Sequence, residues 1–230
     1  MKKLIFLSLY SLSLSISAQI QQINNGSFNE LIFFVGISNP EYDNAEGSRY
    51  LDKEFVLAKI NDIKKAQLIR FNVVENSIEV MKEGGKIMYL SQSHPYTIKL
   101  LGGSNKVYET KPYIDDNGAK NTSFFEKVHV DERYTLYRKE RIKYVPKKIA
   151  KSSYDQDVPA KFVNVNDHFY MTDFKSKSSE LIEIPRKKKS FLNFFKDSSN
   201  KLDKFVKKEK LKFENTDDLI KILDFYFAYK

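Results

Sequence analysis

The sequence predicts a mainly β protein with C-terminal helices, in the α+β class. Three observations lead to this prediction. Between residues 50 and 185 short apolar runs alternate with turn residues, a pattern typical of strands joined by tight turns. The chain contains 18 Phe and 14 Tyr but neither Trp nor Cys, which favours half-buried pleated surfaces. After Pro185 the chain becomes rich in lysine with helical periodicity. We expect an antiparallel meander sheet, as a sandwich or open barrel, followed by a basic helical tail.

Residues 1–18 have the three parts of a secretory signal peptide. Lys2 and Lys3 are positive, residues 4–16 are largely apolar, and small residues precede the expected cleavage after Ala18. The apolar run is shorter than the roughly 20 residues that span a bilayer. We therefore predict export, which makes the mature protein periplasmic, outer-membrane-associated or secreted.

Residues 19–49 read as an irregular leader, and residues 50–185 as the antiparallel β domain. Strands are expected at 31–35, 68–74, 77–82, 87–90, 96–101, 106–114, 124–130, 134–145, 162–165, 169–174 and 181–184. Glu75-Asn76, Gly84-Gly85 and Gly102-Gly103 supply turn chemistry between them. Consecutive strands this close leave no room for crossover helices, which predicts antiparallel pairing.

Residues 186–230 are expected to form a helical tail that packs on the β domain. In its first expected helix Leu202, Phe205 and Val206 lie on one side of the helical wheel, with lysines opposite. Asn200 is a candidate N-cap of this helix. A last, largely apolar helix is expected to begin at Asn215 or Thr216.

Six short motifs lie along the chain in a rhythm of apolar and turn residues. They are Ser48-Arg49-Tyr50-Leu51-x-x-Glu54-Phe55, Leu68-Ile69-Arg70-Phe71-Asn72, Ile78-Glu79-Val80, Tyr134-Thr135-Leu136-Tyr137, Lys187-Lys188-Lys189 with Phe191-Leu192, and Lys210-Leu211-Lys212-Phe213 ahead of Asp217-Asp218-Leu219. Together they resemble a family of uncharacterised secreted proteins from the Bacteroidetes. The resemblance spans roughly residues 47–230 and rests on the rhythm of apolar and turn residues. It implies a cell-envelope or secreted location in a Gram-negative bacterium, and it brings no functional residues with it.

Motifs for catalysis, cofactor binding and metal binding are not found in the sequence. A Gly-x-Ser-x-Gly elbow, a phosphate-binding loop and a dinucleotide fingerprint are all missing, as is Cys. His129 and Asp131 are expected to point the same way from one strand, together with Lys127, and His168 follows Asp167 at a turn. Two ligands fall short of the three or four that a zinc site takes. We expect no catalytic, cofactor or metal site, while a divergent enzyme remains an alternative.

The positive charge of the chain is concentrated in the tail, where it could bind an anionic surface. Residues 186–213 hold eleven Lys or Arg against three Asp or Glu, a net charge of +8 in a chain of +9. The candidate anion or partner surface comprises Arg186, Lys187, Lys188, Lys189, Lys201, Lys204, Lys207 and Lys208. Such a cluster favours an anionic membrane or lipopolysaccharide, although lysines on an amphipathic helix also serve solubility alone.

Together these features favour a non-enzymatic interaction module of the envelope. Its expected partner is another envelope protein, and the alternative is an anionic membrane surface. Nucleic acid is not expected, because an exported protein seldom meets it.

Overall fold

The computed structural model describes residues 31–36, 39–103, 105–115, 117–150, 152, 155–172 and 179–228. The expected signal peptide lies outside the described residues. The fold class is confirmed, because strands make up most of the ordered structure and the helices follow them. Among the described residues, no helix has the length and the hydrophobicity that crossing a membrane requires.

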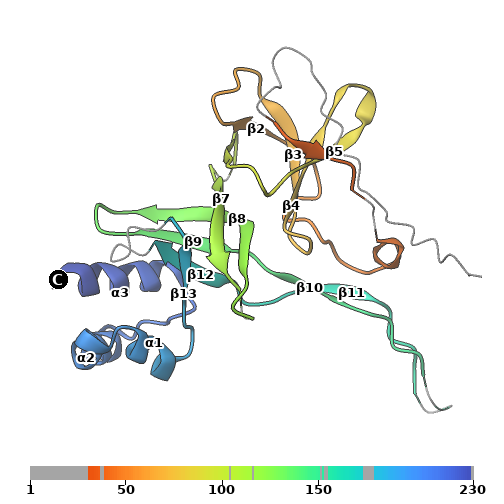
Figure 1. Ribbon diagram of the computed structural model, residues 1–230. Helices are drawn as coiled ribbons and strands as arrows, with labels where there is room; N and C mark the ends of the chain where they lie inside the picture. Colours follow the sequence, from red (N-terminus) through yellow and green to blue (C-terminus); the bar gives the residue numbers. More distant parts are fainter. Residues whose placement is uncertain are drawn as a thin grey trace, which may run out of the picture.

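The first lobe is a curved antiparallel sheet that ends at a long shared strand, β7 (Figure 1). Its strands are β1 (Phe33–Phe34), β2 (Val56–Ile60), β3 (Gln67–Asn72), β4 (Ser77–Met81), β5 (Ile87–Leu90) and β6 (Thr97–Leu100), with short 3-10 helices η1 (Pro40–Tyr42) and η2 (Glu83–Gly85). They lie in the order β1-β5-β4-β3-β2-β6-β7. Alternate side chains of these strands, such as Ile78, Val80 and Ile98, are fully buried in one apolar core. This alternation follows from the period of two along a strand.

The second lobe contains a ring of five strands. They are β7 (Val107–Ile114), β8 (Lys120–Val130), β9 (Thr135–Lys139), β12 (His168–Thr172) and β13 (Leu181–Ile184). Each pairs with the next, and the parallel pair of β13 with β7 closes the ring. Aromatic side chains of Phe125, Tyr137 and Tyr170 pack together with Leu181 as a separate cluster. Closure removes strand edges that would otherwise be open to other chains.

The helical tail covers the other face of these strands. It consists of α1 (Lys188–Phe194), η3 (Lys196–Ser198), α2 (Ser199–Glu209) and α3 (Thr216–Ala228). Leu202 and Val206 of α2 are buried with Phe169 and Met171 of β12. The rings of Phe205 and Phe225 stack 4.0 Å apart between α2 and α3. The tail is therefore packed on the β domain, as the amphipathic pattern indicates.

Three details of the sequence prediction are wrong. The sheet is not wholly antiparallel, because β13 runs parallel to β7, a long-range pair that neighbouring-strand logic does not foresee. The expected strand 134–145 divides into β9 and β10 (Ile142–Val145), which belong to different sheets. Asn200 lies inside α2 rather than at its N-cap, since the helix begins at Ser199, two residues earlier than predicted, and Ser198 holds the cap position.

The last helix begins where the sequence predicts. Asn215 precedes Thr216, and its side-chain oxygen accepts a hydrogen bond from the Asp218 amide at 3.0 Å. This is the pattern of an N-cap, in which a side chain satisfies one of the amides left open at the helix start. Helix α1, by contrast, is an element that the sequence did not indicate.

Candidate functional site

A two-stranded arm, residues 141–150 and 155–164, projects from the body of the molecule (Figure 1). Strand β10 (Ile142–Val145) pairs antiparallel with β11 (Lys161–Asn164), and a bridge between Lys148 and Val158 extends the ribbon. These two strands form a sheet of their own. A two-stranded ribbon is at best marginally stable in water, so the arm needs support at its base.

Aromatic rings from the leader supply that support. Tyr42 contacts Tyr144 of β10 and Phe162 of β11, with ring centroids 4.9 and 5.4 Å apart. The Glu46 carbonyl accepts a hydrogen bond from the Phe162 amide at 2.8 Å, and the Glu46 amide donates to Ala160 at 2.8 Å. The leader therefore holds the base of the arm in a fixed direction.

The outer part of the arm exposes apolar side chains among basic ones. Ile149 is 68% exposed and Val158 is 41% exposed. Asp157 is tied to its own ribbon, because Lys147 Nζ lies 2.9 Å from one carboxylate oxygen and the Ala150 amide donates to the other at 2.9 Å. Residues 141–161 contain six Lys or Arg and two Asp, a net charge of +4. The basic character is therefore shared by the tail and the arm, which corrects the view that it belongs to the tail alone.

An open charged cleft of about 480 Å³ lies at the base of the arm. The end of β9, the first residues of the arm, the Asn164–Asp167 turn and the loop before α3 line it. Behind it is a network of paired charges. Arg138 Nη2 lies 2.7 Å from Glu126, and Lys106 pairs with both Glu126 and Glu140. The Tyr108 hydroxyl donates to Glu140 at 2.7 Å.

Burial shapes the titration of this network. It raises the pKa of the Asp167 carboxyl, although Arg138 at 3.9 Å and the Arg141 amide at 3.2 Å favour the charged form. Burial beside Glu140 likewise raises the pKa of the Tyr108 hydroxyl, which stays a hydrogen-bond donor at neutral pH. For Arg138 burial disfavours the charge, but the hydrogen bonds to Glu126 raise its pKa overall. The network therefore joins the two lobes to the arm through buried, paired charges.

Arg70, His129 and His168 do not converge in one site. Arg70 bonds to Glu79 at 2.6 Å, and its guanidinium lies over the Tyr50 ring. His129 Nε2 lies 3.9 Å from Asp224 of α3. His168 bonds to Glu183 at 2.8 Å. Each has its own partners in a different part of the fold.

The expected common face of Lys127, His129 and Asp131 is not observed. A β-bulge shifts the register between Lys127 and His129. Lys127 consequently contacts Glu109, whereas His129 contacts the Tyr134 ring. In the part of the chain that the structure describes, no group of three or more His, Asp or Glu side chains is placed to hold a metal ion.

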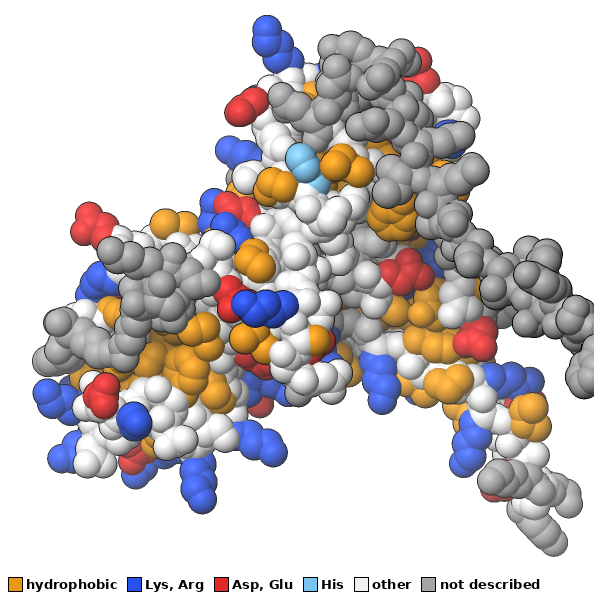
Figure 2. Space-filling view, viewed as in Figure 1, with side chains coloured by type: hydrophobic (Ala, Val, Ile, Leu, Met, Phe, Trp, Pro, Cys, Tyr) orange, Lys and Arg blue, Asp and Glu red, His pale blue; other side chains and the backbone are white. Residues whose placement is uncertain are grey.

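The lysines of the predicted tail surface are exposed. They are Lys187, Lys188, Lys189, Lys201, Lys204, Lys207 and Lys208, while Arg186 is half-buried. Figure 2 shows lysine side chains standing out around the helical tail. Two of them share Asp203, because Lys188 lies 2.5 Å and Lys207 2.7 Å from its carboxylate oxygens. Hydrogen bonds from these two lysines lower the pKa of Asp203. The tail thus keeps most of its positive charge at the surface.

Sequence reasoning missed the arm and the charged cleft. The run 134–145 looks like one strand, and only Glu140-Arg141 in its middle marks the point where the chain leaves the ring. The cleft joins residues from β9, the arm and the tail, which nothing in their spacing brings together.

No family model, curated protein or solved structure matches this chain. The resemblance to secreted proteins of the Bacteroidetes remains a prediction.

Proposed function

We propose that this chain is a non-enzymatic interaction module, exported to the cell envelope or secreted, and that the arm is the part that contacts another envelope protein. The export step rests on the three-part sequence of residues 1–18. The observation that carries the contact is the arm itself, a supported ribbon that leaves the body and presents Ile149 and Val158 to solvent.

The exposed side chains of the arm are costly without a partner. Burying an exposed Ile or Val side chain against another protein stabilises a complex by the transfer of apolar surface from water, about 25 cal/mol per Å². An open ribbon edge also invites the addition of a strand, because its amides and carbonyls can pair with another chain. Glu46 already pairs with part of the outer edge of β11, so the added strand would lie along β10. The net charge of +4 selects an acidic partner surface and steers the encounter.

A position-specific crosslink in cells tests this proposal. A photoreactive amino acid at Val158 should give a defined adduct, whereas the same group at exposed Lys99 on β6 should not. The Ile149→Ser substitution should abolish the adduct at 158. Equal crosslinking from positions 158 and 99, or an adduct that survives Ile149→Ser, would rule out the arm as the contact.

The exposed lysines of the tail favour a second function, peripheral binding to an anionic membrane or lipopolysaccharide. Lys187, Lys189 and Lys204 are exposed and form no ion pair with any residue that the structure describes. Each Lys near an anionic surface adds about 1 kcal/mol, so replacing all three by Gln should weaken vesicle binding by about 3 kcal/mol, or roughly 100-fold.

A matched triple variant in the arm separates the two surfaces. Lys143, Lys147 and Lys148 also carry three charges, and their replacement by Gln changes the net charge of the chain by the same amount. As salt is added, the tail variant should dissociate from phosphatidylglycerol vesicles at a lower salt concentration than the arm variant, which should stay bound. Equal loss in both variants would show a general charge effect, and binding that ignores salt would exclude the electrostatic mechanism.

A further inference from the structure

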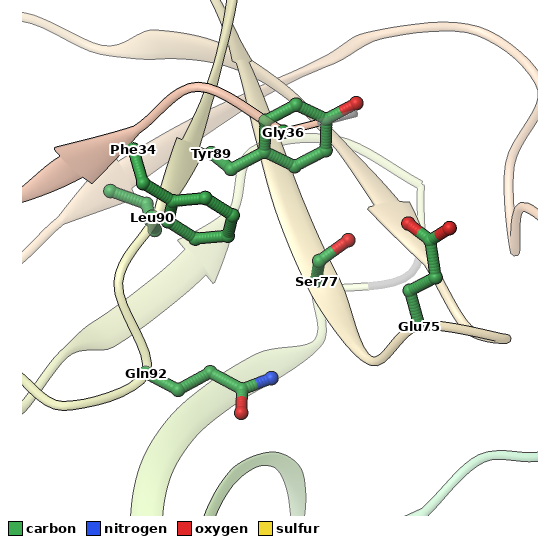
Figure 3. Close-up of a pocket in the computed structure, with 7 residues that line it drawn as sticks. All are labelled: Phe34, Gly36, Glu75, Ser77, Tyr89, Leu90 and Gln92. Atoms are coloured by element: carbon green, nitrogen blue, oxygen red, sulfur yellow. The ribbon is translucent and has the colours of Figure 1, made fainter. Parts of the chain in front are cut away.

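A second pocket lies on the first lobe, away from the arm. It occupies about 350 Å³ beside β1, β4 and β5, and Figure 3 shows the side chains around it. The rings of Phe34 and Tyr89 stack with their centroids 5.4 Å apart and an angle of 28° between them. Phe34 and Tyr89 are cross-strand partners of β1 and β5, so the pairing register fixes their contact. The result is a partly exposed apolar shelf.

Gly36 lets the backbone pass directly beside this shelf. A Cβ atom at Gly36 would lie 2.5 Å from Cε2 of Tyr89, closer than any real contact. A side chain at this position would have to displace the Tyr89 ring. The shelf therefore depends on the absence of a side chain at residue 36.

The pocket contains a polar group without a partner. Ser77 is 6% exposed, and its hydroxyl makes no hydrogen bond to any described residue. In Figure 3 the Ser77 hydroxyl and the Glu75 carboxylate both point to the side where the Tyr89 ring lies. A buried hydroxyl without a partner costs free energy, and such a group in a native structure calls for an explanation. A bound ligand that supplies the missing hydrogen bond is one.

The other polar groups of the pocket are hydrogen-bond acceptors with spare capacity. Glu75 Oε2 accepts from Asn72 Nδ2 at 2.9 Å, which leaves its second oxygen for a ligand. The Gln92 amide nitrogen is held by Asn76, so its carbonyl oxygen remains as an acceptor. Acceptors of this kind around an aromatic shelf suit a molecule with several hydroxyl groups and an apolar ring face.

The electrostatics favour a neutral ligand over a cation. Desolvation raises the pKa of the Glu75 carboxyl, and the negative charge of Glu79 acts in the same direction. The positive charge of Arg49 lowers the pKa of Glu75 and partly neutralises the negative potential of its carboxylate. A cation bound at the pocket would also be repelled by Arg49.

We propose that this pocket binds one sugar unit, a neutral ring rich in hydroxyl groups that stacks on Phe34 and Tyr89 and bonds to Ser77, Glu75 and Gln92. This site is independent of the arm and goes beyond the proposed protein contact, so each can fail without the other.

Saturation-transfer NMR on the full chain tests the proposal, with glucose, galactose, mannose and N-acetylglucosamine as probes and tetramethylammonium as the cationic comparison. At least one sugar should receive saturation, strongest at the ring protons of its apolar face. Ser77→Ala should weaken that sugar by about tenfold, the effect of one hydrogen bond. Tyr89→Leu should remove binding, because the stacking surface is lost.

Stability measurements keep the test independent of folding. Ser77→Ala removes a hydroxyl that has no partner, so its midpoint of thermal unfolding should match or exceed that of the parent protein. Glu83→Gln changes a carboxylate whose side chain is 99% exposed outside the pocket and should leave binding unchanged. Saturation of tetramethylammonium alone, no transfer to any of the four sugars, or unaltered sugar binding by both pocket variants would each overturn the proposal.

Discussion

The Asn76 side chain pairs with the Phe124 backbone as a strand would. Asn76 Nδ2 donates to the Phe124 carbonyl at 3.1 Å, and Asn76 Oδ1 accepts from the Phe124 amide at 2.9 Å. Ser123 Oγ donates to the same amide oxygen at 2.6 Å. The turn between β3 and β4 is thereby fastened to β8, and β8 joins the ring of the second lobe. One amide group thus links the two lobes at a point where no ladder connects them.

Asn76→Ala should destabilise the protein by about 3 kcal/mol, because four side-chain hydrogen bonds are lost and two backbone groups of Phe124 lose their partners. Asn76 has φ 47, so alanine also adds strain of the left-handed region. Asn105→Ala is the control, since Asn105 has the same φ of 47 and is exposed. Urea unfolding should show the larger loss at 76, and the Phe124 amide should exchange faster. An equal loss of unfolding free energy in the two variants would show that backbone strain, and not the lost hydrogen bonds, causes the whole effect.

Phe191→Ala should loosen the helical tail. Phe191 is fully buried, with ring centroids 4.9 Å from Phe195 and 4.6 Å from Phe213. Removing a buried Phe side chain costs about 3–5 kcal/mol. Trypsin should then cleave faster at Arg186 and Lys187, which precede α1, and at Lys188 and Lys189 in its first turn, and the midpoint of urea unfolding should fall.

Phe194→Ala provides the comparison on the same helix. Phe194 is 37% exposed, so its loss should cost less than about 1 kcal/mol. Similar cleavage rates in the two variants would mean that α1 does not hold the tail on the ring.

The sequence allowed most strands to be predicted, because turns such as Asn76 and Gly84-Gly85 separate them in the chain. Local pattern does not determine which distant strands meet. The pair of Tyr113 with Leu181 closes the ring, and it depends on packing between residues far apart in sequence. The same reason explains the missed sites. Phe34 and Tyr89 look like ordinary strand residues, and only the fold shows that the Ser77 hydroxyl on the next strand, β4, has no hydrogen-bond partner among the described residues.

Glu183→Gln should destabilise the protein at neutral pH and have little effect in acid. The hydrogen bond from His168 at 2.8 Å lowers the pKa of Glu183, and the charges of His168 and Arg186 act in the same direction against burial. A carboxyl whose pKa is lower in the folded state stabilises that state above its ordinary pKa of 4.5. This stabilisation disappears as the pH falls through the lower folded value.

Thermal unfolding at several pH values measures this effect. At pH 7 the variant should be less stable by about 1 kcal/mol, and the difference should shrink as the pH falls below 4.5. Glu83→Gln, whose nearest cation lies 3.9 Å away at a fully exposed site, should show no such change with pH. A constant difference for Glu183→Gln across the range would show that shape rather than charge matters there.

Lys82 should react with acylating reagents faster than other lysines near pH 8. Burial lowers the pKa of Lys82 to about 8, and the charge of Lys65 acts in the same direction. Its ammonium lies 4.0 Å from the centroid of the Phe33 ring, a contact that favours the charged form but does not offset burial. About half of Lys82 is then neutral at pH 8, compared with less than about 1% of a lysine with the ordinary pKa of 10.5.

Only the neutral amine attacks the reagent, so mass spectrometry after brief acetylation should show Lys82 modified at least about tenfold faster than exposed Lys99. The rate of acetylation at Lys82 should fall with pH as its amine becomes protonated. Its pH profile should have a midpoint near 8. A profile that keeps rising to pH 10 in parallel with that of Lys99 would show that the site does not desolvate the Lys82 ammonium.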